Sequence, residues 1–335
     1  MPDLPLLSII IVNFNSKSVL KDCLNSLLKN NYLREFETFV IDNASSESIA
    51  DLPGEYQTCR FIFNKQNLGF AAANNIGIRQ ANGKYILLLN PDTIVNKDSF
   101  APMIKYLDDN IDTGVVGCKI FNAEGGIERS THSFPSLLKE FVHANEFLKT
   151  LMSYDSLFGK LFRKKSRLKA FESYWDHDSK REVDHVTGAC MMVKRETIEK
   201  AGLLDEAFFL YNEEVEWSLR IKKAGYKSVF LPDSNIIHLF GHSTGQKVQK
   251  QKVNRLLVER YRGMLYFFGK HYGFFKQTIL RAIVLEGFAL RLLFNYIRTI
   301  GPSMKDKASL TEENKYYKQI IKLAFIRNYD WRKTE

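Results

Sequence analysis

Four polar segments that carry Asp or Asn follow apolar runs in the first 100 residues. They are Asn13-Phe14-Asn15 after SIIIV, Asp42-Asn43-Ala44-Ser45 after TFVI, the segment 67–77, and Asn90-Pro91-Asp92 after YILLL. A carboxylate in such a place can accept hydrogen bonds from a base or a ribose, and a second one beside phosphates can hold a hard divalent cation. Each segment alone is typical of a turn, but their succession favours a nucleotide site.

The apolar runs predict strands that would position these segments. We expect strands at 7–12, 38–41, 60–63, 84–89, 114–121 and within 183–194, and helices at 18–30, 70–80, 99–109, from 195, and at 215–224. This alternation predicts an α/β domain with a mainly parallel sheet. Ligands of such sheets bind beyond the carboxyl ends of the strands, where the polar segments stand. Segment 123–182 breaks the pattern and is predicted to hold covering helices or loops.

Length and composition exclude several classes of protein. The chain has 335 residues, 45% of them hydrophobic and 26% charged, which excludes wholesale disorder, collagen and coiled coil. Its four cysteines form no Cys-x-x-Cys pair, so neither a zinc site nor a disulfide framework is expected, and a reducing compartment fits best. The first residues lack the basic region of a secretory signal. The apolar run 6–12 is too short to span a bilayer.

The positive net charge of +10 is concentrated at the end of the chain. Residues 244–335 contain 19 Lys and Arg against 7 Asp and Glu, whereas residues 1–243 contain 29 against 31. Within this basic region, residues 261–300 combine aromatic and aliphatic side chains with a charge every few residues. The mixture predicts an interfacial amphipathic helix rather than a spanning one. The alternative is that its apolar face packs on its own domain.

The ordered motifs resemble those of a known enzyme family. They are SIIIVNFNS, FVIDNASS, NLGFAAANNIGI, YILLLNPDT, VDHVTGACMMVKR, LLDEAFFLYNEEVEWSLRIKKAGY and IIHLFGHS. In this order the chain resembles family 2 inverting glycosyltransferases of the GT-A fold, in particular the rhamnosyltransferase-like branch. The resemblance implies a GT-A domain over residues 1–243, with an acceptor-side insert at about 123–182 and a basic helical region, 244–335, that could associate with a membrane.

The resemblance also implies an activity. The enzyme would move a sugar, rhamnose being one candidate, from a dTDP- or UDP-linked donor to a saccharide or polyprenyl-linked acceptor during bacterial surface polysaccharide synthesis. It would act in the cytoplasm, at the inner face of the cell membrane. Asp42 would contact the nucleotide base, with Asn13 lining the same pocket. Asn67, Gly69 and Asn74 would lie near the diphosphate-sugar.

A divalent cation, Mg²⁺ or Mn²⁺, is a further implication. Asn90-Pro91-Asp92 takes the place of the family's metal-binding Asp-x-Asp motif, which leaves Asp92 as the main acidic ligand. Because one carboxylate binds such ions modestly, the nucleotide diphosphate must supply further oxygens. His238 matches a family histidine that approaches the metal or the diphosphate. Its alternative is a structural role after an apolar strand, and His242 is a weaker second candidate.

The catalytic base is expected in the Glu-Asp motif of the family. Here the motif reads Glu213-Glu214, and the resemblance implies Glu214 as the base that takes the proton of the acceptor hydroxyl. Because Glu is one methylene longer than Asp, Glu213 stays open as an alternative. Read without the resemblance, these residues are acids in a first helical turn that complement the helix dipole. By the same resemblance, Gly188 and Ala189 would lie at the sugar and Asp184 on the acceptor side.

Two other functions are compatible with parts of the sequence. A nucleotidyltransferase would use a similar sheet, but residues 13–18 contain no glycine and only Lys17, unlike a Gly-rich activation loop. A nucleic-acid-binding protein would use the basic end of the chain. Neither explains the succession of Asp42, Asp92 and Glu214, so we expect a glycosyltransferase and no nucleic-acid partner.

Overall fold

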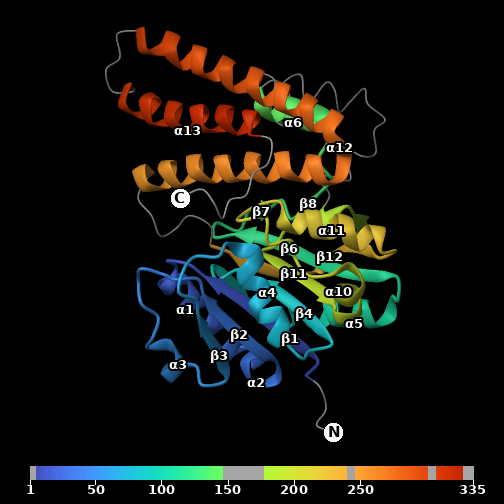
Figure 1. Cartoon of the computed structure of the whole chain (residues 1–335). Coiled ribbons are helices and arrows are strands. Elements are labelled where there is room, and N and C mark those ends of the chain that lie inside the picture. The colour runs from blue at the N-terminus through green and yellow to red at the C-terminus, as the bar shows by residue number, and fades with distance from the viewer. Residues whose placement is uncertain (1–4, 146–176, 240–245, 301–306, 327–335) are drawn as a thin grey trace. The chain divides into compact units, whose positions relative to one another are not determined.

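The structure is a computed structural model that describes residues 5–145, 177–239, 246–300 and 307–326 (Figure 1). The chain forms two compact units. The sheet unit comprises residues 1–134, 174–209 and 213–242. The helical unit comprises residues 135–173, 210–212 and 243–335.

The sheet unit is built on one large mixed sheet. Its strand order is β3-β2-β1-β4-β11-β6-β12-β5. The strands are β1 (Leu7–Asn13), β2 (Glu37–Asp42), β3 (Cys59–Phe63), β4 (Tyr85–Leu89), β5 (Thr93–Val95), β6 (Thr113–Asn122), β11 (Cys190–Lys194) and β12 (Lys227–His238). Strands β3, β2, β1 and β4 are parallel, as are β6 and β12, whereas β11 and β5 run antiparallel to their neighbours. The predicted α/β sheet is thereby confirmed.

Short strands extend this framework near its carboxyl edge. Strand β7 (Ile127–Glu128) pairs with β6, and β9 (Arg181–Val183) pairs with β12. Strands β8 (Thr131–His132) and β10 (His185–Val186) form a separate antiparallel pair. These strands come from the ends of segment 123–182, whose residues 146–176 lie outside the described part of the chain.

Helices cover both faces of the sheet because its central strands are apolar on both sides. In β1, Ile9 and Ile11 face one core, which includes residues of α1 (Lys17–Lys29) and α5 (Ala101–Asp109). Ile10 and Val12 face the second core, which includes residues of α4 (Phe70–Gln80), α10 (Arg195–Ala201) and α11 (Glu213–Lys223). This two-residue alternation is the strand periodicity expected of a doubly covered sheet. The short helices α2 (Tyr32–Glu35) and α3 (Leu52–Glu55) lie in connections.

Strand β12 is the element that the apolar pattern indicates least well. It runs for 12 residues and contains Pro232-Asp233-Ser234, which are turn-forming residues. The structure accommodates them in a register shift between Leu231 and Asn235, where the strand bulges against β6. Because the strand resumes after the bulge, it carries His238 back to the carboxyl edge.

The helical unit contains α6 (Leu137–Ala144), α12 (Gln246–Ile300) and α13 (Lys307–Phe325). Helix α12 is interrupted at Gly273, whose φ of 82° is accessible to glycine without strain. The two halves of α12 lie side by side, since Gln277 Nε2 donates to the carbonyl oxygen of Leu265 at 2.9 Å. Among the described residues, no helix combines the length and apolarity needed to cross a bilayer. The predicted helical character of the C-terminal region is confirmed by α12 and α13.

Candidate active site

The carboxyl ends of β1 and β2 hold Asn13 and Asp42 as neighbours in the strand register. The Asp42 carboxylate accepts hydrogen bonds from Asn13 Nδ2 at 2.8 Å and from the hydroxyl of Ser45 at 2.6 Å. The backbone N–H of Ser45 donates to its second oxygen at 3.2 Å. Both side chains are buried, so the orientation of Asp42 is fixed by the protein itself. Through this hydrogen bond, Asn13 holds the carboxylate of Asp42 in place.

Asn43 organises the segment that leads into α4. Its Nδ2 donates to Asn67 Oδ1 at 2.8 Å and to the carbonyl oxygen of Gly69 at 3.2 Å. Its Oδ1 accepts from Asn64 Nδ2 and from the backbone N–H of Leu68, both at 3.0 Å. Sequence reasoning assigns Asn43 no role of its own, and its place directly after the strand-end Asp42 is the one signal that could have indicated this role.

Gly69 connects this segment to the chain that precedes α11. Its φ is +81°, and a Cβ added there would lie 2.4 Å from the carbonyl oxygen of Phe209. The backbone N–H of Phe70 donates to the same oxygen at 2.7 Å. Asn74, one turn into α4, is buried and donates to the carbonyl oxygen of Phe70. Its side chain therefore supports the start of α4.

We expect Gly69→Ala to lower transfer activity strongly, because its Cβ must displace the backbone at Phe209. The matched control is Gly125→Ala, since Gly125 also has a φ of +81° but an added Cβ there meets nothing within 4 Å. The control should show only the cost of a left-handed alanine, about 1–2 kcal/mol. Thermal unfolding and initial rates of both variants test this. Equal losses in the two variants would contradict a role for the Gly69–Phe209 contact.

Asp92 and His238 meet where β4 and β12 end. Asp92 Oδ1 lies 3.2 Å from His238 Nε2, and the backbone N–H of Leu239 donates to the carbonyl oxygen of Asp92 at 2.7 Å. The other ring nitrogen, Nδ1, lies 3.0 Å from Glu128 Oε2. Burial disfavours the imidazolium, but the hydrogen bonds and charges of Asp92 and Glu128 outweigh it and raise the pKa of His238 to about 9.

These side chains fit a divalent cation only in part. A carboxylate and an imidazole are suitable ligands, and a carboxylate on the second ring nitrogen is the usual support of a ligating histidine. Within the described residues, however, no three His, Cys, Asp or Glu side chains form a group that could hold a metal ion. Glu128 is a residue that the sequence did not single out, because it lies on the two-residue strand β7. The predicted His242 lies outside the described residues.

Glu213 and Glu214 open α11 in different environments. The preceding residues, Tyr211 and Asn212, have left-handed φ values of 69° and 71°. Glu213 is buried, and its Oε2 has no hydrogen-bond partner among the described residues. Desolvation, together with the charge of Glu214, raises the pKa of Glu213 well above its ordinary value. Glu214 is partly exposed, and desolvation raises its pKa to about 7 against the hydrogen bonds of the backbone N–H groups.

The segment between β10 and β11 connects Glu214 to the end of β4. A Cβ built on Gly188 would lie 4.0 Å from Glu214 Cβ and 3.6 Å from the ring of Phe70, which is ordinary contact. The next residue, Ala189, accepts a hydrogen bond through its carbonyl oxygen from the backbone N–H of Asn90 at 3.0 Å. Gly188 therefore lies close to Glu214 and to Phe70, the neighbour of Gly69, while the next residue along the chain bonds to Asn90.

Asp184 is engaged by the protein. One of its oxygens accepts from the backbone N–H of Phe134 at 3.0 Å, and the other pairs with Lys222 at 2.9 Å. The Lys222 ammonium also lies over the Phe134 ring, 5.4 Å from its centre. Asp184 thus fastens the chain near β8 to α11, and its acceptor-side role stays a prediction.

Comparisons with known proteins identify the family of the chain. Residues 8–202 match the sequence model of the family described as glycosyl transferase family 2. The chain is similar to N-acetylglucosaminyl-diphospho-decaprenol L-rhamnosyltransferase of Mycobacterium tuberculosis, with 23% identity over 83% of this chain and 89% of that protein. It is also similar to rhamnosyltransferase WbbL of Escherichia coli, with 25% identity over 70% of this chain and 83% of WbbL.

A solved structure shows the same fold at low sequence identity. It is the mannosyltransferase PcManGT of Pyrobaculum calidifontis in complex with GDP-Man and Mn²⁺, with 14% identity and a TM-score of 0.53 over 98% of this chain and 89% of that one. The family match covers more than half of the chain. The protein is a member of glycosyl transferase family 2, a glycosyltransferase with the GT-A fold.

Proposed function

We propose that the enzyme transfers a sugar, with rhamnose as the first candidate, from a nucleotide diphosphate donor to a saccharide or polyprenyl-linked saccharide. The transfer would invert the anomeric carbon and serve bacterial surface polysaccharide synthesis. The observation that carries the proposal is that Glu214, with a pKa of about 7, lies against Gly188 at the same sheet edge as Asn90. The names of the two rhamnosyltransferase relatives support the choice of sugar.

Each polar group at this edge has a distinct part in the proposed reaction. Asp42 receives the nucleotide base, dTDP or UDP being the donors to test first. Asp92 and His238, the latter after loss of its imidazolium proton, would hold a divalent cation, Mg²⁺ or Mn²⁺, together with oxygens of the diphosphate. That cation would supply positive charge to the leaving nucleotide diphosphate. Asn67 and Gly69 lie beside the diphosphate-sugar, and Ala189 beside the sugar.

Glu214 is the proposed base, rather than Glu213. A general base works best when its pKa is near the operating pH, because it is then both ionised and able to take a proton. Glu214 meets this condition and is partly exposed. Glu213 is buried, and desolvation raises its pKa well above the usual range, which favours its neutral form over the carboxylate that a base requires. Glu214 therefore takes the proton of the acceptor hydroxyl as that oxygen attacks the anomeric carbon.

The turnover number should fall as the pH decreases through about 7. Glu214 must be ionised to act as a base, and its raised pKa places the protonated, inactive form below neutrality. A single proton predicts about a tenfold loss of kcat for each pH unit on the acid limb. A kcat profile between pH 5 and 9 at saturating substrates tests this. A rate constant that stays unchanged down to pH 5 would contradict the assignment.

The protein is further proposed to act at the cytoplasmic face of the cell membrane. The support is the excess of basic residues in 244–335 and the lipid named in the mycobacterial relative's description, decaprenol. A polyprenyl-linked acceptor is confined to a bilayer, so an enzyme that approaches it gains from binding the same surface. That the protein does not bind nucleic acid stays a prediction.

A thermal-shift screen tests the donor class directly. Nucleoside diphosphates and their sugars are added with and without Mn²⁺, followed by a transfer assay with each ligand that binds. A ligand at about 100 times its dissociation constant should stabilise the folded state by about 2.7 kcal/mol. Stabilisation by dTDP-rhamnose or a UDP-hexose, larger with the cation, supports the proposal. No stabilisation by any nucleotide diphosphate sugar would overturn it.

A further inference from the structure

One end of the helical unit presents aromatic side chains to solvent. Phe274 and Phe275 follow the break at Gly273 and are 75% and 77% exposed. Phe325, the last residue of α13, is 70% exposed, and Ile326 follows it with 38%. We call Phe274, Phe275, Phe325 and Ile326 the aromatic tip. Such exposure is unusual for side chains that lose free energy in water.

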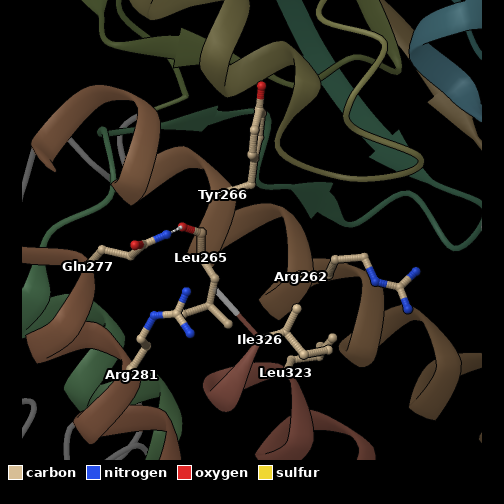
Figure 2. A pocket seen from close by; sticks show the side chains of 7 residues that line it. All are labelled: Arg262, Leu265, Tyr266, Gln277, Arg281, Leu323 and Ile326. Carbon is tan, nitrogen blue, oxygen red and sulfur yellow. Dashed lines mark hydrogen bonds between the residues drawn. The ribbon is translucent and has the colours of Figure 1, made fainter. Parts of the chain in front are cut away.

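The two parts of the aromatic tip are brought together by the antiparallel packing of α13 on the second half of α12. A guanidinium nitrogen of Arg281 donates to the carbonyl oxygen of Ala324 at 2.6 Å. Ile326 lines a small cavity, of about 40 Å³, together with Gln277 and Arg281 (Figure 2). At the far end of the same helix pair, Asn295 Nδ2 donates to Asn314 Oδ1 at 3.0 Å. Residues about 50 positions apart in the sequence therefore share one end of the unit.

All charged residues close in sequence to the aromatic tip, within 262–285 and 315–326, are basic. Residues 262–285 contain four Lys and Arg and no Asp or Glu, and residues 315–326 contain three Lys and no Asp or Glu. The exposed ammonium groups nearest the tip belong to Lys270, Lys276 and Lys322. Lys276 lies over the ring of Tyr272, 5.1 Å from its centre, which keeps its charge at this end.

The far end of the same helices has a different character. The first turns of α13 carry Glu312 and Glu313 near the Asn295–Asn314 hydrogen bond. Exposed apolar side chains occur toward this end too, with exposed fractions between 49% and 64%: Leu290, Leu293, Phe294, Tyr296 and Ile297. The aromatic tip thus differs from the far end in having no acidic residues close in sequence, since residues 286–315 contain five Lys and Arg against four Asp and Glu.

We propose that the aromatic tip docks into the head-group region of an anionic lipid bilayer. The phenylalanine side chains would enter the boundary of the acyl chains while the three lysines meet anionic head groups. The inference deepens the proposed function by stating how the enzyme reaches a lipid-linked acceptor, and it rests on that function only for this purpose. Charge complementarity selects the bilayer, since the stretches 262–285 and 315–326 of the described chain offer Lys and Arg and no Asp or Glu.

A second copy of the chain fits this surface less well. A symmetric contact places the same patch of both copies face to face. Lys270, Lys276 and Lys322 of one copy would then oppose the same lysines of the other, and like charges in contact are unfavourable. An anionic bilayer has no such cost.

Vesicle sedimentation of the full chain tests the proposal. The vesicles contain either equal parts of phosphatidylcholine and phosphatidylglycerol or phosphatidylcholine alone. Wild type should bind the anionic vesicles more tightly, and the preference should fall with added salt. Replacement of Phe274 and Phe275 by Ser should weaken this binding about tenfold or more, since each loses the contact of a large apolar side chain. Lys270→Gln and Lys276→Gln should each weaken it about fivefold.

The matched control is the double variant Leu290→Ser, Leu293→Ser, which removes exposed apolar surface toward the far end, where basic and acidic residues nearly balance. It should sediment with anionic vesicles as wild type does. Equal loss in this control, equal binding of the Phe274/Phe275 variant and wild type, or no preference for anionic lipid would each overturn the proposal. If the Phe274/Phe275 substitutions changed the oligomeric state in solution but left vesicle binding unchanged, the tip would instead be a contact between copies of the chain.

The assay separates this proposal from the proposed function. Vesicle binding is measured without donor or acceptor, so it does not depend on the reaction. Hydrolysis of the nucleotide sugar in detergent-free buffer should be unchanged in the Phe274/Phe275 variant, because the tip is remote in sequence from the site residues. Circular dichroism and thermal unfolding confirm that the variants fold, as expected for substitutions of exposed side chains.

Discussion

Glu214→Gln is expected to lower kcat by about 100-fold or more while the affinity for the donor nucleotide stays close to that of wild type. The amide has the shape of the carboxylate but cannot take a proton, and general base catalysis contributes about 10²–10⁴-fold. Desolvation holds the pKa of Glu214 at about 7, so the wild-type side chain is poised for proton transfer. Single-turnover rates and donor titration measure the two quantities separately.

Glu213→Gln is the matched control for this prediction. Glu213 is the neighbouring carboxyl of the same helical turn, and burial raises its pKa well above the ordinary value, which favours the neutral form. A neutral amide in its place should change kcat by only a few fold and leave the acid limb of the pH profile near 7. If Glu213→Gln removed activity while Glu214→Gln retained it, the roles of the two residues would be exchanged.

Thermal unfolding of Glu214→Gln provides a second measurement, in which the variant is expected not to fall below wild type although its activity does. A carboxyl with a raised pKa in the folded state favours folding while it is protonated, and this contribution is lost as the pH rises through about 7. Glutamine never ionises. Above pH 7 the variant should therefore unfold at a temperature equal to or higher than wild type, although it is far less active. A marked loss of stability would attribute the inactivity to misfolding instead.

Asp92→Ala is expected to weaken cation-dependent donor binding by at least about tenfold. Removal of a partner that merely orients a metal ligand typically costs about 10–100-fold in metal affinity, and a direct ligand should cost no less. The variant also leaves His238 with only Glu128 as its acidic partner, so the pKa of His238 should decrease from about 9. Calorimetric titration of the donor with Mn²⁺ and with EDTA measures the effect.

Asp233→Ala is a suitable control for Asp92→Ala, because Asp233 is an exposed carboxylate on the same strand as His238. It should bind the donor as wild type does, with the same response to EDTA. Glu128→Gln should give an intermediate loss, since it keeps the hydrogen bond to the imidazole but removes the charge. Donor binding that is insensitive to both Asp92→Ala and EDTA would refute the cation site.

The sequence predicts the local framework of the site well, because strand ends and helix starts are encoded within a few residues. The apolar runs indicate β1, β2 and β4 close to their observed bounds, and helix α4 begins and ends where the pattern predicts. Since parallel strands end at one edge, the approach of Asp42 to Asn13 follows from these elements. The roles expected of the individual site residues came from the resemblance of the motifs to family 2 glycosyltransferases.

The contacts that hold the site together could not be predicted in this way. The Gly69–Phe209 contact joins residues 140 positions apart, and neither a glycine nor a phenylalanine at these positions predicts such a contact. Glu128 reaches His238 only because β12 resumes after a bulge at turn-forming residues. The aromatic tip likewise depends on α13 packing antiparallel to half of α12. Each is a tertiary effect that local patterns do not contain.

The anomeric configuration of the product is the most direct test of the central claim, that Glu214 activates an acceptor hydroxyl for direct displacement of the nucleotide diphosphate. The NMR coupling constant between the anomeric carbon and its hydrogen gives this configuration when it is compared between donor and product. We predict inversion. Retention of configuration would contradict the account, because it requires a different sequence of bond changes from the single displacement that Glu214 serves.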